Sequence, residues 1–375
     1  MKLKNAAVTG TLAVATAVAL TACSAGGGDG TGSPTTLDSS HTIVDYSSLA
    51  GTLTGGGSSA QANAEAAWTA AFTAQSGGIT VNYDKSQGSG GGVTNWLNGS
   101  YDFAGSDAPL TAAEQTKSQK TCGSRGGYDL PVYLSGVAII YNLPGIDDLK
   151  LGSATLAKIF TKKITKWNDP AIAAENPGVV LPSRSITTVT RSDSSGTTDN
   201  FSTYLRDVQP GIWTTVPSTT WPITGTSAQQ GGTGVVNTVE SGVGTIGYAD
   251  QSSIGKAKAA DIQVGTSNTF VSYSASGATN AFDAVATNDP STAGDLTQKL
   301  DYSKITETDA YPIPLLSYQI VCSHFTSAHQ ATLTKAYLGF VASEIGQAVA
   351  AKNAGSAPIP ASMLAKIQDT LKLID

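Results

Sequence analysis

The pattern of apolar and polar positions alternates between short β-like runs and amphipathic helical segments. The β-like runs are residues 52–54, 79–83, 102–104, 131–141, 186–190, 244–248 and 318–322. The helical pattern covers residues 60–75, 93–97, 155–160, 197–205, 328–351 and 361–373. Strands that alternate with helices predict an α/β fold with open sheets. In such sheets ligands bind outside the strand ends, at the turns that lead into the helices.

The first 23 residues have the pattern of an export signal. Lys2 and Lys4 precede an apolar stretch over residues 6–19, and the run Leu-Thr-Ala-Cys then ends at Cys23. This order predicts a secretory signal peptide over residues 1–22. The alternative is a transmembrane helix, but the stretch is shorter than the ~20 residues that span a bilayer. The Leu-Thr-Ala-Cys end resembles the bacterial lipobox, which implies cleavage before the cysteine and lipidation of its thiol.

The segment after the signal is rich in Gly, Ser and Thr. Apart from Pro34, residues 24–34 contain no apolar side chain larger than Ala. Such a segment cannot bury enough apolar surface to order itself, so we expect a flexible tether over residues 23–47. A tether would let a globular body move over a membrane partner.

Length and charge narrow the possible classes of protein. At 375 residues the chain is long enough for two domains, and 40% hydrophobic with 13% charged residues is typical of a globular protein. Removing Lys2 and Lys4 with the signal lowers Lys+Arg from 22 to 20 against 28 Asp+Glu, which gives a mature net charge of −8. This acidic balance argues against nucleic acid as a partner.

The cysteines predict one disulfide. If Cys23 is lipidated, Cys122 and Cys322 are the pair that remains in an oxidising compartment. The alternative is two buried free thiols.

Three predicted turns before helices combine Gly with Ser or Thr. They are residues 55–59 (GGGSS), 88–92 (GSGGG) and 191–197 (RSDSSGT). A helix N-terminus offers unpaired N–H groups and a partial positive charge, and glycine lets an anion approach the backbone closely. The hydroxyls add donors without adding charge. Because Ser and Thr are also ordinary helix caps, the prediction of an anion site depends on the three turns together.

Charged residues in these regions refine the prediction. The planar guanidinium of Arg191 matches an oxyanion, and Asp193 is placed to hold it, although the two could also form an ordinary surface ion pair. Asp107 would repel an anion unless the anion carries a proton to donate. Phosphate keeps a proton near neutral pH and sulfate has none, so such a carboxylate would select phosphate. The alternative for Asp107 is a cap or turn residue before Ala-Pro.

Six segments of the chain carry a resemblance to a known family. They are residues 53–59, 102–110, 156–160, 164–172, 191–197 and 244–248. Together they make residues 49–372 resemble the phosphate-binding lipoproteins of bacterial Pst-type ABC phosphate importers. The resemblance implies an α/β, two-domain periplasmic-binding-protein clamshell with chain crossings near Leu134 and Ile313. Domain I would comprise residues 48–134 plus 314–375, and domain II residues 135–313.

The resemblance also implies a set of phosphate ligands. They fall on Ser59, Ala60, Ser89, Asp107, Arg191, Ser195, Gly196 and Thr197, with Asp193 orienting the arginine. This chain has Ser59 where the family commonly has Thr, and Ala60 where it commonly has an aromatic residue. Ala60 could therefore contribute only its backbone N–H, and Ser58 is a second candidate for the role of Ser59. The loop before Ser89 is one residue longer, and Gly90 replaces a frequent Ser.

The resulting expectation is a monomeric binding protein, anchored by lipid at the extracytoplasmic face of the cell membrane. It would close two domains over one inorganic phosphate and deliver it to the membrane permease subunits of an ABC importer, without a cofactor. The rivals are a secreted phosphatase on the same fold, a binder of sulfate or molybdate, and a surface adhesin. A phosphatase would need a metal cluster or an activated nucleophile. None of His41, His324 and His329 has a second ligand at metal-like spacing, and the sequence predicts no metal site.

Overall fold

The computed structural model describes residues 46–375. The predicted signal peptide, the predicted lipidation site Cys23 and nearly all of the predicted tether lie outside the described residues. No helix within residues 46–375 is long and apolar enough to cross a membrane.

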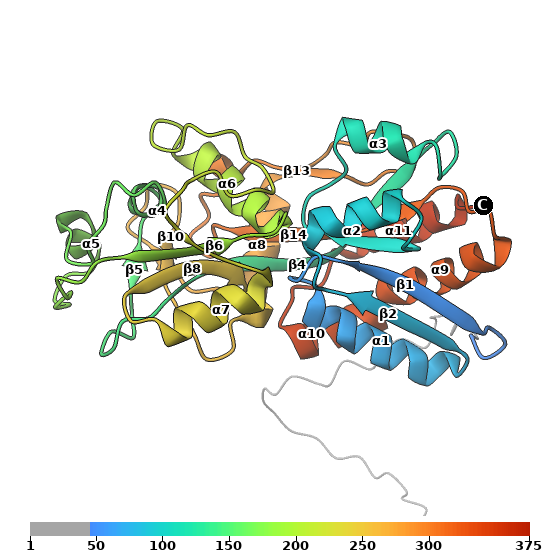
Figure 1. Cartoon of the computed structure of the whole chain (residues 1–375), viewed down its shortest axis with the longest axis horizontal. Coiled ribbons are helices and arrows are strands. Elements are labelled where there is room, and N and C mark those ends of the chain that lie inside the picture. Colours follow the sequence, from blue (N-terminus) through green and yellow to red (C-terminus); the bar gives the residue numbers. More distant parts are fainter. Residues whose placement is uncertain (1–45) are drawn as a thin grey trace, which may run out of the picture. The chain divides into compact units, whose positions relative to one another are not determined.

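The first lobe is built on three parallel strands with helices from both ends of the chain. The strands are β1 (Gly51–Gly57), β2 (Ile79–Asp84) and β3 (Phe103–Ser106), with β1 between the other two. The helices that follow these strands are α1 (Ala62–Ser76), α2 (Gly88–Leu97) and α3 (Ala112–Ser118). The C-terminal helices α9 (Ala328–Val341), α10 (Glu344–Ala354) and α11 (Ala361–Lys372) complete this lobe (Figure 1).

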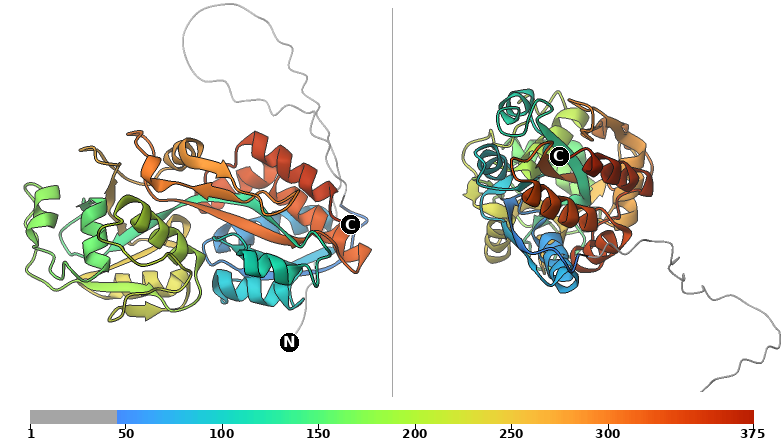
Figure 2. Two further views of the ribbon diagram at one scale, coloured as in Figure 1. Left: turned by 90° about the horizontal axis from the view of Figure 1, so that it is seen from above. Right: turned by 90° about the vertical axis from the view of Figure 1, so that its right-hand side faces the viewer.

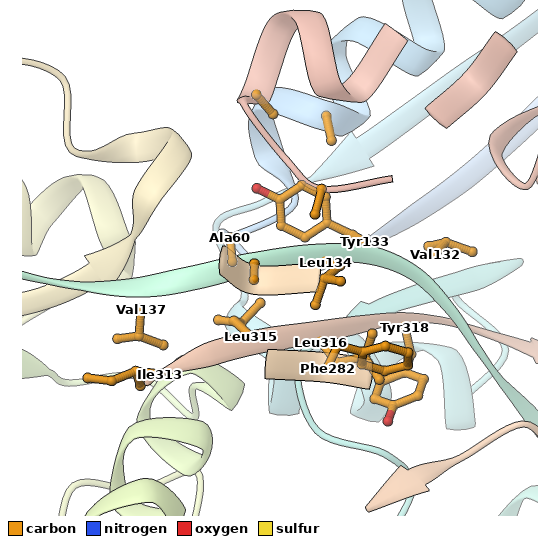
Figure 3. Close-up of a cluster of buried hydrophobic side chains, with 14 of the residues drawn as sticks. Ala60, Val132, Tyr133, Leu134, Val137, Phe282, Ile313, Leu315, Leu316 and Tyr318 are labelled. Atoms are coloured by element: carbon orange, nitrogen blue, oxygen red, sulfur yellow. The ribbon is translucent and has the colours of Figure 1, made fainter. Parts of the chain in front are cut away.

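Two long antiparallel strands connect this lobe to the rest of the molecule. β4 (Gly127–Tyr141) pairs with β14 (Pro314–Cys322) as far as Gly136, and from Val137 onward it pairs with β8 (Thr245–Asp250). With β6 (Thr187–Arg191) and β7 (Ser227–Gln229) beyond β8, the strand order of the sheet is β2-β1-β3-β14-β4-β8-β6-β7. β4 and β14 run side by side between the lobes (Figure 2, left), and Figure 3 shows apolar side chains from both strands packed along the crossing.

The second lobe surrounds the far part of β4. Its sheet strands are β6 (Thr187–Arg191), β7 (Ser227–Gln229) and β8, with the short β9 (Lys258–Ala259) beside β4. Its helices are α4 (Ser153–Phe160), α5 (Pro170–Glu175), α6 (Gly196–Val208) and α7 (Gly231–Ser241). A separate small sheet has the order β11 (Phe270–Val271), β10 (Asp261–Gln263), β5 (Lys150–Leu151).

Residues 260–310, for which the sequence suggested only an exposed edge, include buried structure. Helix α8 (Ala275–Val285) packs against both β4 and β14, and a hairpin of β12 (Ala286–Asn288) and β13 (Gln298–Leu300) follows. Asp295, in the hairpin loop, is buried and accepts a hydrogen bond from the backbone N–H of Asp129 on β4. This segment thus contacts the crossing strands as well as the second lobe.

Several predicted elements had wrong boundaries, and β4 and β14 each begin four residues before the predicted strands 131–141 and 318–322. The predicted helix 328–351 is two helices, because Ser343 caps the start of α10 by accepting a hydrogen bond from Gly346 N–H. The glycines at 55–57 lie in β1 and those at 88–92 lie in α2, although both were expected to form turns. Tertiary packing explains this: a Cβ on Gly92 would lie 2.5 Å from the carbonyl oxygen of Gly56, so these glycines allow a strand and a helix to touch.

The predicted disulfide between Cys122 and Cys322 is confirmed. It joins the segment between α3 and β4 to the end of β14, with Cα atoms 4.7 Å apart and 200 residues of separation.

Candidate functional site

The candidate site is centred on Asp107, which directly follows β3. Its carboxylate is 3% exposed and accepts hydrogen bonds from three hydroxyls. Ser58 and Ser317 donate to Oδ1, the latter over 2.6 Å, and Thr197 donates to Oδ2 over 2.8 Å. The three donors come from the end of β1, the middle of β14 and the start of α6, so both lobes meet at this carboxylate.

The start of α6 lies directly against Asp107. Ser195 is the N-cap, and its hydroxyl accepts from the N–H of Thr198 over 3.2 Å. A Cβ on Gly196 would lie 2.7 Å from the Cβ of Asp107 and from Oγ of Ser89, so only glycine permits this approach. A helix N-terminus beside a carboxylate is suited to an anion that arrives with a proton, because the N–H groups attract its charge.

Arg191, at the end of β6, is held by Asp193. Nε donates to Oδ1 over 2.8 Å and Nη2 donates to Oδ2, and both side chains are at least 95% buried. Burial raises the pKa of Asp193, but the hydrogen bonds and charge of Arg191, with a backbone N–H from Gly231, bring it below its usual value. Asp193 therefore stays ionised and uses two of the five donors of the guanidinium, which fixes the plane of the fork.

The first turn uses its two serines differently. Ser58 contacts Asp107, and its Oγ accepts the backbone N–H of Ala60 over 3.0 Å. Ser59 lies elsewhere: its Oγ accepts from Gly232 N–H, at the start of α7 in the second lobe, over 3.1 Å. The structure thus brings Ser58 to the carboxylate and places Ser59 between the lobes.

Ser89 lies in the first turn of α2 and accepts the N–H of Asp107 over 3.2 Å. Its neighbour Gly90 donates its backbone N–H to the carbonyl of Ser194 over 3.0 Å, and a Cβ on Gly88 would lie 2.3 Å from Oδ2 of Asp193. Helix α2 is therefore in direct contact with the segment that carries the arginine pair.

Two residues near Asp107 were missed by the sequence reasoning. Asn200, one turn into α6, donates from Nδ2 to the carbonyl of Asp107 over 2.5 Å, and Ser317 donates to its carboxylate. The spacing from Gly196 to Asn200, one helical turn, could have suggested the first. Nothing local marks Ser317, which lies within the mostly apolar strand β14.

Within residues 46–375, no group of three or more His, Cys, Asp or Glu side chains could hold a metal ion. The hydrogen bonds at Asp107 come from hydroxyls and an amide, and the one cation in this cluster is Arg191. The arrangement is chemically suited to hold a small tetrahedral anion through hydrogen bonds from neutral donors and from the guanidinium of Arg191.

Comparison with known proteins shows the class of protein to which the chain belongs. A model of the periplasmic-binding-protein (PBP) superfamily domain matches residues 31–344. The chain is 36% identical over 292 residues to "Phosphate-binding protein PstS 3" of Mycobacterium leprae, covering 76% of this chain and 78% of that protein. It is 35% identical over 328 residues to "Phosphate-binding protein PstS 2" of Mycobacterium tuberculosis, covering 85% and 86%.

The chain therefore belongs to the PstS family of phosphate-binding proteins, within the periplasmic-binding-protein superfamily. Its fold agrees with this: the crystal structure of the phosphate-binding protein PfluDING aligns with a TM-score of 0.67 at 22% identity, over 85% of this chain and 93% of that one. The expected α/β, two-lobe clamshell fold is confirmed.

Proposed function

We propose that this chain binds inorganic phosphate between its two lobes and delivers it to an ABC importer. The observation that carries the proposal is the buried Asp107 carboxylate, which lies at the start of α6 and accepts hydrogen bonds from both lobes. The family membership supports the same ligand, because the matched relatives are named as phosphate-binding proteins.

We propose the predicted ligand set with one refinement. Arg191, Ser195, Gly196 and Thr197 approach from the second lobe, and Ser89 and Asp107 from the first. In the first turn we assign Ser58 to the anion site beside the backbone of Ala60, since Ser58 touches the carboxylate and Ser59 contacts α7.

Selection of phosphate over sulfate is the chemical consequence of Asp107. A hydrogen phosphate can donate its proton to the carboxylate in a charge-assisted hydrogen bond. Sulfate has no proton near neutral pH and would leave a buried carboxylate facing another negative charge. A binder of sulfate or molybdate would gain nothing from this residue.

The remaining assignments are extensions of the proposal. We assign the protein to the extracytoplasmic face of the membrane, as a monomer attached through a lipid on Cys23. The change of strand partner along β4 at Gly136 and Val137 supports domain boundaries near Leu134 and Ile313. The phosphatase alternative has no support from the matched relatives, whose names describe binding.

Equilibrium titration calorimetry of the purified protein with inorganic phosphate tests the proposal. Saturable binding of one phosphate per chain is expected, with a rise in the melting temperature as phosphate is added. Absence of both effects would reject phosphate as the ligand. Release of product from a chromogenic phosphate monoester in the same preparation would instead favour the phosphatase.

A further inference from the structure

Ser317 differs from the other two hydroxyls that donate to Asp107. Ser58 and Thr197 belong to the turns where an anion is proposed to bind. Ser317 lies in the middle of β14, is fully buried, and donates to Oδ1 of Asp107 over 2.6 Å from behind the site.

The hydrogen of Ser317 has its direction set by Gln61, which lies just before α1. Nε2 of Gln61 donates to the Ser317 Oγ over 2.6 Å and to the Tyr318 carbonyl over 2.8 Å. A backbone carbonyl can only accept, so the carbonyl fixes which end of the Gln61 amide faces β14. With its oxygen accepting from Gln61, Ser317 must direct its single hydrogen to Asp107.

A second amide holds the first in place. Gln319 lies two residues beyond Ser317 on β14, and the alternation of a strand puts both side chains on one face. Nε2 of Gln319 donates to Oε1 of Gln61 over 2.8 Å and also donates to Glu65 of α1. Gln61, Ser317 and Gln319 are all fully buried, so water does not compete for these bonds.

The chain of donors therefore runs in one direction and ends on the carboxylate. A fixed donor restricts the rotation of the carboxylate that accepts its hydrogen bond. Ser58 and Thr197 can turn toward a bound anion, whereas Ser317 is held on Asp107 by Gln61.

We propose that Ser317, oriented by Gln61, is a positioning residue that holds the Asp107 carboxylate in place as a hydrogen-bond acceptor and thereby sets the selectivity for anions that carry a proton. The inference rests on the proposed function. Without Ser317, Oδ1 of Asp107 would lose the donor whose direction is fixed within the protein. The carboxylate could then turn away from the anion, and its discrimination against sulfate would weaken.

The charged and titratable groups around Asp107 come from several elements. Tyr83 on β2 and Asp199 on α6 both interact electrostatically with its carboxylate. The Arg191–Asp193 pair follows β6, and Glu65 on α1 lies at the far end of the amide chain. None of these groups is altered by a substitution at position 317.

The test measures phosphate and sulfate affinity by calorimetry for the wild type and for Ser317→Ala, near neutral pH and at one ionic strength. We expect the phosphate-to-sulfate affinity ratio of Ser317→Ala to fall about tenfold or more, because one hydrogen bond to a charged group is lost.

Ser323→Ala is the matched control. Ser323 is a fully buried serine just beyond β14 that donates to the Cys122 carbonyl over 2.8 Å and does not touch Asp107. It should lower stability without changing the affinity ratio. Gln61→Met is a second variant. It keeps the Ser317 hydroxyl but removes the donor that sets its direction. Its phosphate-to-sulfate affinity ratio should fall by a smaller factor than that of Ser317→Ala.

A phosphate-to-sulfate ratio that stays at the wild-type value in folded Ser317→Ala would overturn the inference, even if both affinities fall together. If Ser317→Ala does not unfold cooperatively, an unchanged ratio in Gln61→Met overturns it instead. Failure of the proposed function looks different, since the wild type would then bind no phosphate.

Discussion

At the residue scale, the candidate site depends on which atoms can only accept and which can only donate hydrogen bonds. Asp107 is a buried acceptor beside N–H and O–H donors from both lobes, and Arg191 is a donor whose orientation Asp193 fixes. A substitution that keeps the charge of a side chain but changes its shape can therefore show whether the charge or the hydrogen-bond geometry matters for binding.

Replacement of Arg191 by Lys keeps the charge and removes the planar fork. We expect phosphate affinity to fall by about tenfold or more, because a lysine ammonium cannot bond Asp193 and the anion in the same geometry. Calorimetry measures the change. Arg125→Lys, in a partly exposed arginine that bonds the Leu373 carbonyl, is the control and should bind as the wild type does. Full affinity in Arg191→Lys would show that the fork is not used.

Glu65 should make stability depend on pH. Burial raises its pKa to about 8, although hydrogen bonds from Tyr337 and Gln319 lower it in part. At a pH between the ordinary pKa of a glutamate and about 8, Glu65 keeps a proton in the folded state that it has lost in the unfolded state. The stability present below the ordinary pKa of a glutamate is therefore lost progressively as pH rises toward 8.

Glu65→Gln cannot ionise, so its free energy of unfolding relative to the wild type should increase with pH, by about 1–3 kcal/mol between pH ~5 and pH ~8. Urea unfolding at several pH values measures this difference. The exposed Glu240→Gln variant should show no such trend. A difference for Glu65→Gln that is flat across the range would mean that Glu65 is ionised in the folded protein.

At the scale of elements, helix starts and strand ends bring these residues together. β1, β3 and β6 end at the site, and α6 and α7 begin there, so short turns deliver most of the polar groups. The start of α7 also contacts Ser59, and α2 contacts Ser194. Close contact between elements is possible because glycine occupies the points where they meet.

Gly196 is the most sensitive of these points. In Gly196→Ala the new Cβ would lie 2.7 Å from the Asp107 Cβ and 2.8 Å from its backbone nitrogen. The two lobes would have to separate slightly, and we expect phosphate affinity to fall by about tenfold or more, since small displacements at a site of this kind are costly. The fold should survive, because Gly196 has no left-handed backbone conformation.

Gly232→Ala is the control for this substitution. Gly232 begins α7 and also faces the first lobe, but the nearest atoms to an added Cβ are 3.5 Å away. Its phosphate affinity should stay close to that of the wild type. Equal losses in both variants would indicate a general effect on the helices rather than a close approach at Asp107.

The sequence could predict most elements and part of the site for a physical reason. Apolar periodicity is local, so the main strands and helices could be placed, but the short strands β5, β7 and β9–β13 and the helices α3, α5, α7 and α8 were not predicted. Asp107, Arg191 and the start of α6 follow short motifs. Ser317 could not be found, because it meets Asp107, 210 residues earlier in the chain, only through the antiparallel pairing of β14 with β3. The glycines of β1 and α2 were misassigned because their role is packing between elements.

At the scale of the whole molecule, two strands connect the lobes, and a disulfide joins Cys122 to Cys322 at the end of β14. β4 and β14 cross side by side (Figure 2), and the Cys122–Cys322 bridge lies at the end of this pair farther from the second lobe. Most of the second lobe is therefore enclosed within the loop that the disulfide closes.

Removing the bridge should lower stability without abolishing binding. A loop of 200 residues restricts the unfolded chain strongly, so Cys122→Ser with Cys322→Ser should cost about 2–5 kcal/mol in the free energy of unfolding. Phosphate affinity at low temperature should stay nearly unchanged, since neither cysteine lies near Asp107. Reductant should destabilise the wild type and leave the double variant unaffected; an equal effect on both would argue against the bridge.

The central claim is that the buried carboxylate of Asp107 admits only an anion that brings its own hydrogen. Parallel calorimetric titrations of the wild-type protein with phosphate and with sulfate, near neutral pH and at one ionic strength, test it most directly. The account predicts that phosphate binds at least ~100-fold more tightly than sulfate, because sulfate leaves the Asp107 charge unpaired. Similar affinities for the two anions would contradict it.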